Sequence, residues 1–163
     1  MSLKRPQKPD ELAARDPARV RAKALALLAR REHSAGELRT KLRERGYEST
    51  AVEAVLSSLA QEKLLSDARF VQEFVASRVR RGSGPMKIRA ELRGRGVEGE
   101  LADLALAALK GASAEGAAAA RRKRFGDDLP KDMQERARQA RFLQQRGFSM
   151  DDIRKVLKGD LED

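Results

Sequence analysis

The chain has 163 residues, and its 35 Lys and Arg against 25 Asp and Glu give a formal net charge of +10. It contains no Cys, which excludes disulfides, thiolate nucleophiles and cysteine-based zinc sites. Only 40% of the residues are apolar and 4% aromatic, which favours several small helical cores over one large core. The surplus of positive charge indicates a polyanionic partner or an acidic protein surface.

The first 16 residues are charged and contain Pro, without the apolar core of a signal peptide. We expect them to form a disordered N-terminal tail. Further along, no apolar run approaches the roughly 20 residues that a transmembrane helix needs. The sequence therefore predicts a cytoplasmic protein that does not contact a membrane.

The pattern Leu-x-x-Arg-Gly occurs three times and ends at Gly46, Gly96 and Gly147. These glycines are 50 and 51 residues apart, and an apolar residue follows each of them. Because Gly readily adopts the left-handed conformation that ends a helix, we expect each one to turn the chain at a helix end. The sequence predicts three copies of one helical unit, over residues 17–65, 66–111 and 112–163.

The first unit contains signals for three helices. Asp16 is a predicted N-cap before Pro17, which begins a helix that runs to about residue 31. Ser34 and Glu37 form a capping box for a second helix to residue 45. Apolar residues at helical spacing predict a third helix over about 49–62.

The later units repeat this plan. The second restarts at Ser66 and places Pro85 at the start of its second helix. The third has an Ala-rich helix over about 112–125, a second helix that opens after residues 126–130, and Ser149 as the cap of its last helix. Because a 50-residue unit buries little surface alone, stacking on its neighbours would supply the rest. The predicted fold is all-α: an elongated, curved array of three tandem three-helix, helix-turn-helix-like repeats.

Few residues suggest chemistry. His33 has no second metal ligand near it in sequence, so we interpret it as a solvated linker histidine. The pairs Asp127-Asp128 and Asp151-Asp152 lie at or before predicted helix starts, where negative charge offsets the helix dipole. No phosphate-binding loop, nucleophile elbow or histidine metal motif is present. We therefore predict no catalytic residue, no metal site and no cofactor, and a protein that is not an enzyme.

Clusters of basic residues are the strongest functional signal. In order of preference, the candidate partner-binding residues are Arg80, Arg81, Lys87, Arg89 and Arg93, then Arg39, Lys41 and Arg43, then Arg121, Arg122, Lys123 and Arg124. The alternative is a solvated face with cations near helix C-termini, which suffices for Arg45, Arg95 and Arg146. It does not explain the one-sided charge of the second unit, where binding is favoured.

Composition does not choose between phosphate and acidic protein side chains as the target. The few aromatic residues argue against a dedicated single-strand binder. The scarcity of Asn and Gln in these helices argues against sequence-specific reading of bases.

Several motifs together carry a resemblance to a known family. They are the segment 24–34 (Ala-Leu-Ala-Leu-Leu-Ala-Arg-Arg-Glu-His-Ser), Glu37-Leu38, Lys41-Leu42, Arg45-Gly46-Tyr47, Leu64-Leu65-Ser66-Asp67 with Phe70, Gly84-Pro85, Ile88, Glu91-Leu92, and Arg146-Gly147-Phe148-Ser149 with Ile153. Over about residues 17–158 the chain resembles the RecX family of bacterial regulatory proteins.

The resemblance implies a negative modulator of RecA, the recombinase that polymerises on single-stranded DNA. Such a protein would bind the RecA nucleoprotein filament, in its groove, and restrain strand exchange, ATP hydrolysis and LexA cleavage. We expect a monomer that makes these contacts through its basic face. The alternative is a helical-repeat protein that binds single- or double-stranded DNA directly and acts without RecA.

Overall fold

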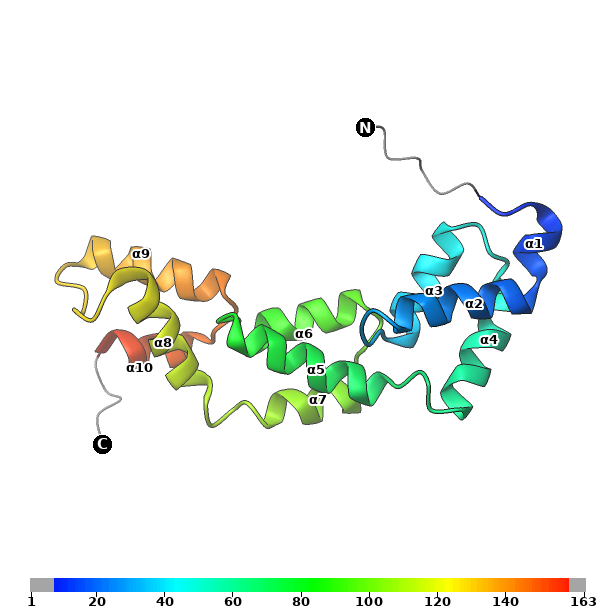
Figure 1. Ribbon diagram of the computed structural model, residues 1–163. Coiled ribbons are helices and arrows are strands. Elements are labelled where there is room, and N and C mark those ends of the chain that lie inside the picture. Colours follow the sequence, from blue (N-terminus) through cyan, green and yellow to red (C-terminus); the bar gives the residue numbers. More distant parts are fainter. Residues whose placement is uncertain (1–7, 159–163) are drawn as a thin grey trace. The chain divides into compact units, whose positions relative to one another are not determined.

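The computed structural model describes residues 8–158, and this part of the chain contains helices and no strand (Figure 1). The helices are α1 (Glu11–Arg15), α2 (Pro17–Leu28), α3 (Ala35–Glu44), α4 (Ser49–Gln61), α5 (Asp67–Arg80), α6 (Pro85–Gly94), α7 (Glu100–Ala107), α8 (Ser113–Phe125), α9 (Met133–Gln145) and α10 (Met150–Lys158). Contacts divide the chain into two compact units. The first consists of Met1–Phe70 with Arg95–Val97, and the second of Val71–Gly94 with Glu98–Asp163.

The first unit has its core between α2, α3 and α4, where the apolar stripes of three amphipathic helices meet. Its fully buried members are Val20, Ala24, Leu38, Leu42, Val52 and Leu59. The expected caps begin these helices: Asp16 Oδ1 accepts a hydrogen bond from the Ala18 N–H at 3.0 Å, and Ser34 Oγ accepts one from the Glu37 N–H at 3.0 Å. Local signals in the sequence therefore set where α2 and α3 begin.

The N-terminal segment differs from the disordered tail that the sequence predicts for residues 1–16. Residues 11–15 form α1, which begins at Asp10, whose side chain accepts a hydrogen bond from the Ala13 N–H at 2.8 Å. The Glu48 N–H donates to the Ala14 carbonyl at 2.9 Å, and Arg15 forms an ion pair with Glu48 at 2.8 Å. These contacts order a helix that is too short to be stable alone. The predicted tail is wrong for these residues, and residues 1–7 lie outside the described part.

His33 is buried, with 2% of its surface exposed, so the prediction of a solvated linker histidine is wrong. Helix α2 ends at Leu28, before the predicted residue 31, and the linker that follows places the imidazole against α3. His33 Nδ1 lies 3.0 Å from the Arg31 carbonyl oxygen, and Nε2 lies 3.1 Å from Lys41 Nζ. The ring therefore donates to a carbonyl and accepts from an ammonium, which requires the neutral imidazole.

The three repeated glycines have the left-handed backbone that the sequence predicts, with φ of +92° at Gly46, +77° at Gly96 and +93° at Gly147. The Tyr47 N–H donates to the Leu42 carbonyl and the Phe148 N–H to the Leu143 carbonyl, both at 3.2 Å. In each case the residue after the glycine bonds back to the leucine of the motif. This is the hydrogen bond that closes a helix in a Schellman motif.

Each of two Arg-Gly turns also packs against the start of the second helix of the preceding repeat. In the first unit, Ser34 Oγ donates to the Arg95 carbonyl at 2.5 Å, and a Cβ on Gly36 would lie 2.9 Å from Gly96 Cα. In the second unit, the Gly84 N–H donates to the Arg146 carbonyl at 2.7 Å. Glycine is needed at both turns because the backbones approach so closely.

The second unit has a core in its third repeat, where α8, α9 and α10 meet. Its buried members are Ala117, Ala118, Leu143, Phe148, Ile153, Val156 and Leu157. Ser149 caps α10 as expected, accepting from the Asp152 N–H at 3.1 Å. Asp127 and Asp128 do not cap a helix, because α9 begins later, at Met133, and its N-cap is Asp132. That part of the prediction is wrong.

None of the helices between residues 8 and 158 combines the length and the apolar character of a membrane span. The three tandem three-helix repeats follow the predicted order, with α2–α4, α5–α7 and α8–α10 as their helices. The exact repeat boundaries and the curvature of the array stay predictions.

Candidate anion-binding groove

A hollow of about 320 Å³ in the second unit brings together two of the predicted basic clusters. Its walls are the C-terminal end of α5, one face of α8 and the end of α9. The lining residues are Val79, Arg80, Arg81, Gly82, Gly116, Ala119, Ala120, Lys123, Arg124, Phe142 and Arg146. We call this hollow the basic groove, since five of its residues are cationic and none is acidic.

Small residues on α8 allow the groove to form. Gly116, Ala119 and Ala120 lie on the face of α8 that lines it, and a Cβ on Gly82 would lie 3.9 Å from that of Ala120. The turn that follows α5 therefore packs closely on α8. Arg146 Nη1 donates to the Arg81 carbonyl at 3.2 Å and connects the end of α9 to the same turn. The backbone around Arg80 and Arg81 is thus held from two sides.

The cations of the groove are available to a ligand. Within residues 8–158, the side chains of Arg80, Arg81 and Lys123 form no hydrogen bond or ion pair. Arg124 lies over the Phe125 ring at 5.6 Å, and Arg146 over the Phe142 ring at 5.2 Å. The helix dipoles favour Lys123 and Arg124 in the last turn of α8 and Arg80 in the last turn of α5, but they do not explain why cations from both helices line one hollow. A concave surface with one sign of charge attracts anions.

Other predicted cations have protein partners. Arg39 Nε lies 2.5 Å from Glu53 Oε1, and Arg43 Nη2 lies 3.9 Å from the same oxygen. The hydrogen bond from Arg39 lowers the pKa of the Glu53 carboxyl below its ordinary value. Lys41 contacts His33 and lies 3.8 Å from Glu37. These three residues of α3 therefore do not form the open basic face that their spacing suggests.

The predicted cluster of first preference is divided between paired and unpaired cations. Arg89 pairs with Asp103 at 2.6 Å, and Arg93 lies 3.7 Å from Glu98. Lys87 is exposed and unpaired among the described residues, but it does not line the groove. Only Arg80 and Arg81 of this cluster reach the groove.

In the third cluster, Arg121 is structural. It is 4% exposed and donates to the carbonyls of Asp127, at 3.0 Å, and Asp128, at 2.9 Å. Its inclusion among the binding residues was wrong, because a helix directs neighbouring side chains to different faces and this one faces the core. Arg122 is exposed but lines no described hollow, whereas Lys123 and Arg124 line the groove.

Sequence reasoning did not place Arg146 in the groove and assigned it only to the helix end. It also missed Phe142, which lines the groove. Neither has a local signal of binding, because both reach the groove only through the packing of α9 on α8. The available clue was the run of small residues on α8, which allows close packing of other elements.

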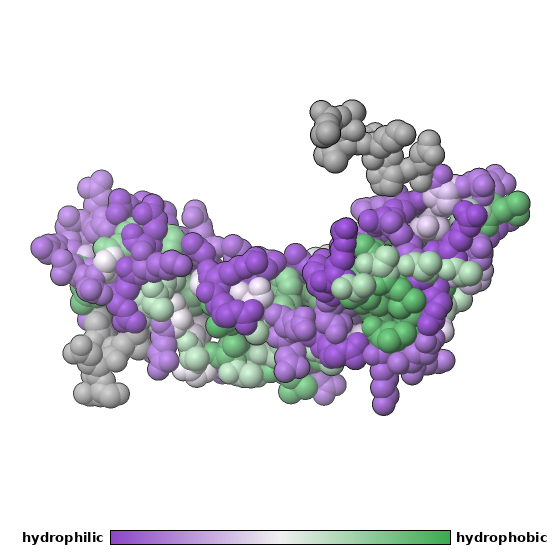
Figure 2. Space-filling model, viewed as in Figure 1, coloured by the Kyte–Doolittle hydropathy of each residue, from purple (hydrophilic) through white to green (hydrophobic). Residues whose placement is uncertain are grey.

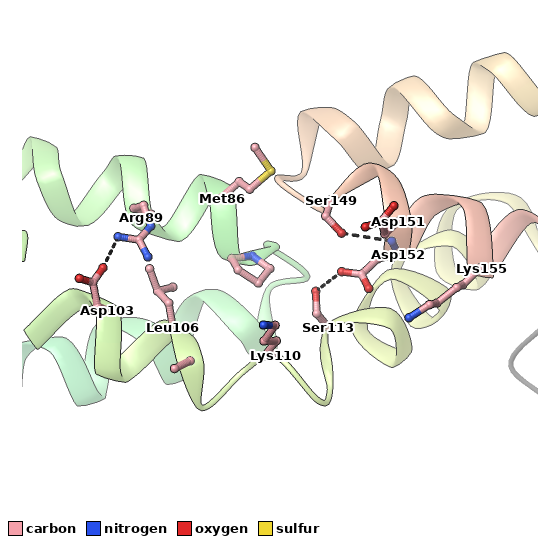
Figure 3. Close-up of a pocket in the computed structure, with 12 residues that line it drawn as sticks. Met86, Arg89, Asp103, Leu106, Lys110, Ser113, Ser149, Asp151, Asp152 and Lys155 are labelled. Atoms are coloured by element: carbon pink, nitrogen blue, oxygen red, sulfur yellow. Dashed lines mark hydrogen bonds and ion pairs between the residues drawn. The ribbon is translucent and has the colours of Figure 1, made fainter. Parts of the chain in front are cut away.

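A larger cavity of about 810 Å³ in the same unit has balanced charges and is a weaker candidate for an anion (Figure 3). In it, Arg89 pairs with Asp103 at 2.6 Å, and Ser113 Oγ donates to Asp152 Oδ2 at 2.7 Å. Charged and polar residues cover most of α9 in the face that Figure 2 shows.

Among residues 8–158, no three His, Asp or Glu side chains gather as a metal-binding group.

Comparison with known proteins matches three domains of one family in succession. They are RecX, first three-helix domain, over residues 21–59, RecX, second three-helix domain, over 66–106, and RecX, third three-helix domain, over 114–157. The chain belongs to the RecX family. The basic groove accordingly joins the end of the first helix in the second RecX domain to the first two helices of the third.

Individual RecX proteins agree with this assignment. The chain is 46% identical to the regulatory protein RecX of Halorhodospira halophila over 144 residues, which cover 88% of this chain and 89% of the relative. It is 47% identical to that of Pseudomonas tolaasii over 145 residues, 88% and 94% of the two chains. The crystal structure of RecX from Lactobacillus salivarius has the same fold, with a TM-score of 0.74 at 20% identity over 90% of this chain and 97% of that one. These matches confirm the predicted family and the three tandem repeats.

Proposed function

We propose that this protein is a negative modulator of RecA. It binds the RecA–single-stranded DNA filament, in the groove of the filament, and restrains strand exchange, ATP hydrolysis and LexA cleavage. Membership of a family of regulatory proteins supports a regulatory role. We infer from that role a cytoplasmic monomer that acts by binding and not by catalysis.

The observation that carries the proposal is the set of unpaired cations in the basic groove. A nucleoprotein filament presents phosphates together with protein sites that recur at regular intervals. Arg80, Arg81 and Lys123 supply the opposite charge without a competing carboxylate. Three linked domains multiply weak contacts through effective concentration, so no single contact has to be tight. The positive charge also speeds the encounter with the filament.

The test is a titration of the wild-type protein into RecA with single-stranded DNA, with ATP hydrolysis and LexA cleavage as readouts. Both activities are expected to fall at amounts of this protein below that of RecA. Unchanged ATP hydrolysis and LexA cleavage, with the protein folded by circular dichroism, would refute the proposal.

A charge-reversal pair connects the effect to the groove. Arg80→Glu with Arg81→Glu is expected to weaken inhibition by tenfold or more, since about 1.4 kcal/mol of lost binding is a factor of ten. Lys87→Glu with Arg122→Glu is the matched control, because it reverses the same number of charges at two exposed cations of the same unit that are unpaired among the described residues and do not line the groove. Equal effects of the two variants would mean that net charge, and not the groove, determines inhibition.

A further inference from the structure

The amine of Lys41, on α3, lies beside a fixed proton acceptor in the first unit. Its Nζ is 3.1 Å from His33 Nε2. Because His33 Nδ1 donates its proton to the Arg31 carbonyl oxygen at 3.0 Å, Nε2 presents a lone pair to the amine. The imidazole is only 2% exposed, so the packing around it holds the ring in this orientation.

The Lys41 side chain is nevertheless accessible from solvent, since 32% of its surface is exposed. The nearest carboxylate, that of Glu37, lies 3.8 Å from Lys41 Nζ. Glu37 already accepts two hydrogen bonds from Arg31, at 2.6 and 3.1 Å. Since an ion pair weakens with distance, this carboxylate stabilises the Lys41 ammonium less than it stabilises Arg31.

The surroundings of Lys41 favour its neutral amine. Burial lowers the pKa of the Lys41 ammonium below its ordinary value of 10.5, and the charge of Glu37 opposes this effect. Nearby positive charges lower that pKa further, from Arg31, Arg45 and Arg95. Near neutral pH, Lys41 is therefore an uncharged nucleophile more often than an ordinary lysine is.

We propose that Lys41 is a site of covalent acylation by acyl phosphates, with His33 as the proton acceptor. The lone pair of the neutral Nζ forms a bond to the acyl carbon, the bond from that carbon to the phosphate oxygen breaks, and phosphate leaves with the electron pair. One proton of the amine passes to His33 Nε2 and from there to solvent. The product is a neutral amide, whose N–H can again donate to Nε2. This reaction needs no RecA and goes beyond the proposed function.

The cations around the amine favour an acyl donor that carries a phosphate. Arg45 Nη1 donates to the Lys41 carbonyl at 3.1 Å, which holds this arginine one helical turn after the lysine. Its guanidinium forms no other hydrogen bond or ion pair within residues 8–158, so further N–H groups are available to an anion. Arginine bonds phosphate through two parallel N–H groups. An uncharged acyl ester would gain nothing from this contact.

The first experiment incubates the full-length protein with acetyl phosphate and follows each lysine by mass spectrometry of proteolytic peptides. Lys63 is the matched control, because it belongs to the same unit, is more exposed than Lys41, and has no side-chain hydrogen bond or ion pair in the described part of the chain. Lys41 should be acetylated several-fold faster than Lys63. An equal or faster rate at Lys63 would mean that exposure determines reactivity, and it overturns the proposal.

The second experiment tests the proton acceptor. In His33→Gln the amide can accept a hydrogen bond from Lys41 but cannot take up its proton. With wild-type circular dichroism, this variant should acetylate Lys41 several-fold more slowly and Lys63 at an unchanged rate. An unchanged rate at Lys41 overturns the role of His33.

The pH profile of the wild-type protein tests the same role without a substitution. Below the ordinary imidazole value of pH 6.5, acetylation should decrease more steeply at Lys41 than at Lys63, because a protonated His33 cannot accept a proton. Arg31 and Glu37 also face the ring, and neither takes up a proton in this range. Parallel profiles at the two lysines contradict the proposal.

An uncharged donor tests the choice of leaving group. Arg45→Gln should slow acetylation of Lys41 by acetyl phosphate several-fold more than acetylation by p-nitrophenyl acetate, which carries no phosphate. Equal losses with both donors would overturn the assignment of an acyl phosphate. Since RecA is absent throughout, these results are independent of the inhibition test.

Discussion

Helix α3 and the basic groove both contain clusters of cations, but they differ in what surrounds those cations. On α3, Arg39 and Arg43 share the carboxylate of Glu53 on the neighbouring helix, and Lys41 contacts His33. In the groove, no Asp or Glu lines the walls, and the side chains of Arg80 and Arg81 have no hydrogen-bond or ion-pair partner between residues 8 and 158.

This difference shows that a count of charges along a helix does not give the charge that a partner meets. Exposed ion pairs such as those of α3 contribute roughly 0 to 1 kcal/mol to stability and leave little field outside. Unpaired cations in a concave site repel one another and contribute nothing to folding, but they attract an anion. We therefore interpret the first set as structural and propose the second set for binding.

The repeated glycines allow the largest contrast between the two units. Gly147 and Gly46 have nearly the same φ, +93° and +92°. A Cβ on Gly147 would overlap the backbone nitrogen of Lys87, whereas one on Gly46 would meet Pro9 Cδ at 3.3 Å. We expect Gly147→Ala to lower the free energy of unfolding of the second unit by about 3 kcal/mol, from strain and overpacking together. Gly46→Ala, with strain alone, should cost the first unit about 1 kcal/mol.

Urea denaturation of both variants, followed by circular dichroism, measures these losses. Gly94→Ala serves as a control, because nothing lies within 4 Å of a Cβ there. If Gly147→Ala cost no more than Gly46→Ala, the packing of the Arg-Gly turn on Lys87 would not stabilise the second unit.

Neutralising cations in the groove should weaken binding but not stability, whereas neutralising cations on α3 should lower stability but hardly change binding. Arg81→Gln with Lys123→Gln is expected to weaken inhibition of RecA about tenfold, equal to about 1.4 kcal/mol, without loss of stability. Arg39→Gln with Arg43→Gln should change inhibition less than about twofold and lower stability by under about 1 kcal/mol. Dose–response curves measure the inhibition, and thermal unfolding measures the stability, of each of the two variants. A larger loss of inhibition from the α3 pair would reverse the assignment.

The sequence predicted the elements that depend on local signals. Asp16, Ser34 and Ser149 cap their helices as expected, because an N-cap interacts only with the next few residues. The repeated glycines end helices for the same reason. The family resemblance was also correct, since it rests on motifs that keep their register over the whole repeat.

The candidate site was predicted only in part, because it depends on contacts between residues far apart in sequence. The pairing of Arg39 with Glu53 requires α3 and α4 to pack side by side, and the burial of Arg121 requires the loop after α8 to fold back over it. The groove itself needs α5 and α9 to meet at the small residues of α8. Charge clusters in a sequence therefore indicate which residues to test, while packing decides which remain available.

Acidification is expected to have the smallest effect on stability, and to act on the first unit alone. Burial lowers the pKa of the His33 imidazole below its ordinary value of 6.5, against an opposing effect of its hydrogen bond to the Arg31 carbonyl. Arg31, Glu37 and Lys41 are the charged groups that face the ring. Protonation would place a second cation 3.1 Å from Lys41 Nζ. No His, Asp or Glu lines the groove, so the effect of His33 is confined to the first unit.

The sign of the effect follows from proton uptake. The unfolded chain binds a proton at His33 more readily than the folded chain, so stability is complete above about pH 6.5 and decreases as the pH falls below it. The hydrogen bond from Arg21 lowers the pKa of Glu62 to about 2, so the stability from that carboxylate is lost only below about pH 4.5. Thermal unfolding between about pH 7.5 and 5.5 should therefore report the single histidine of the chain. His33→Gln, which is neutral and able both to donate and to accept, should abolish the slope in that range, whereas an unchanged slope would assign it to another group.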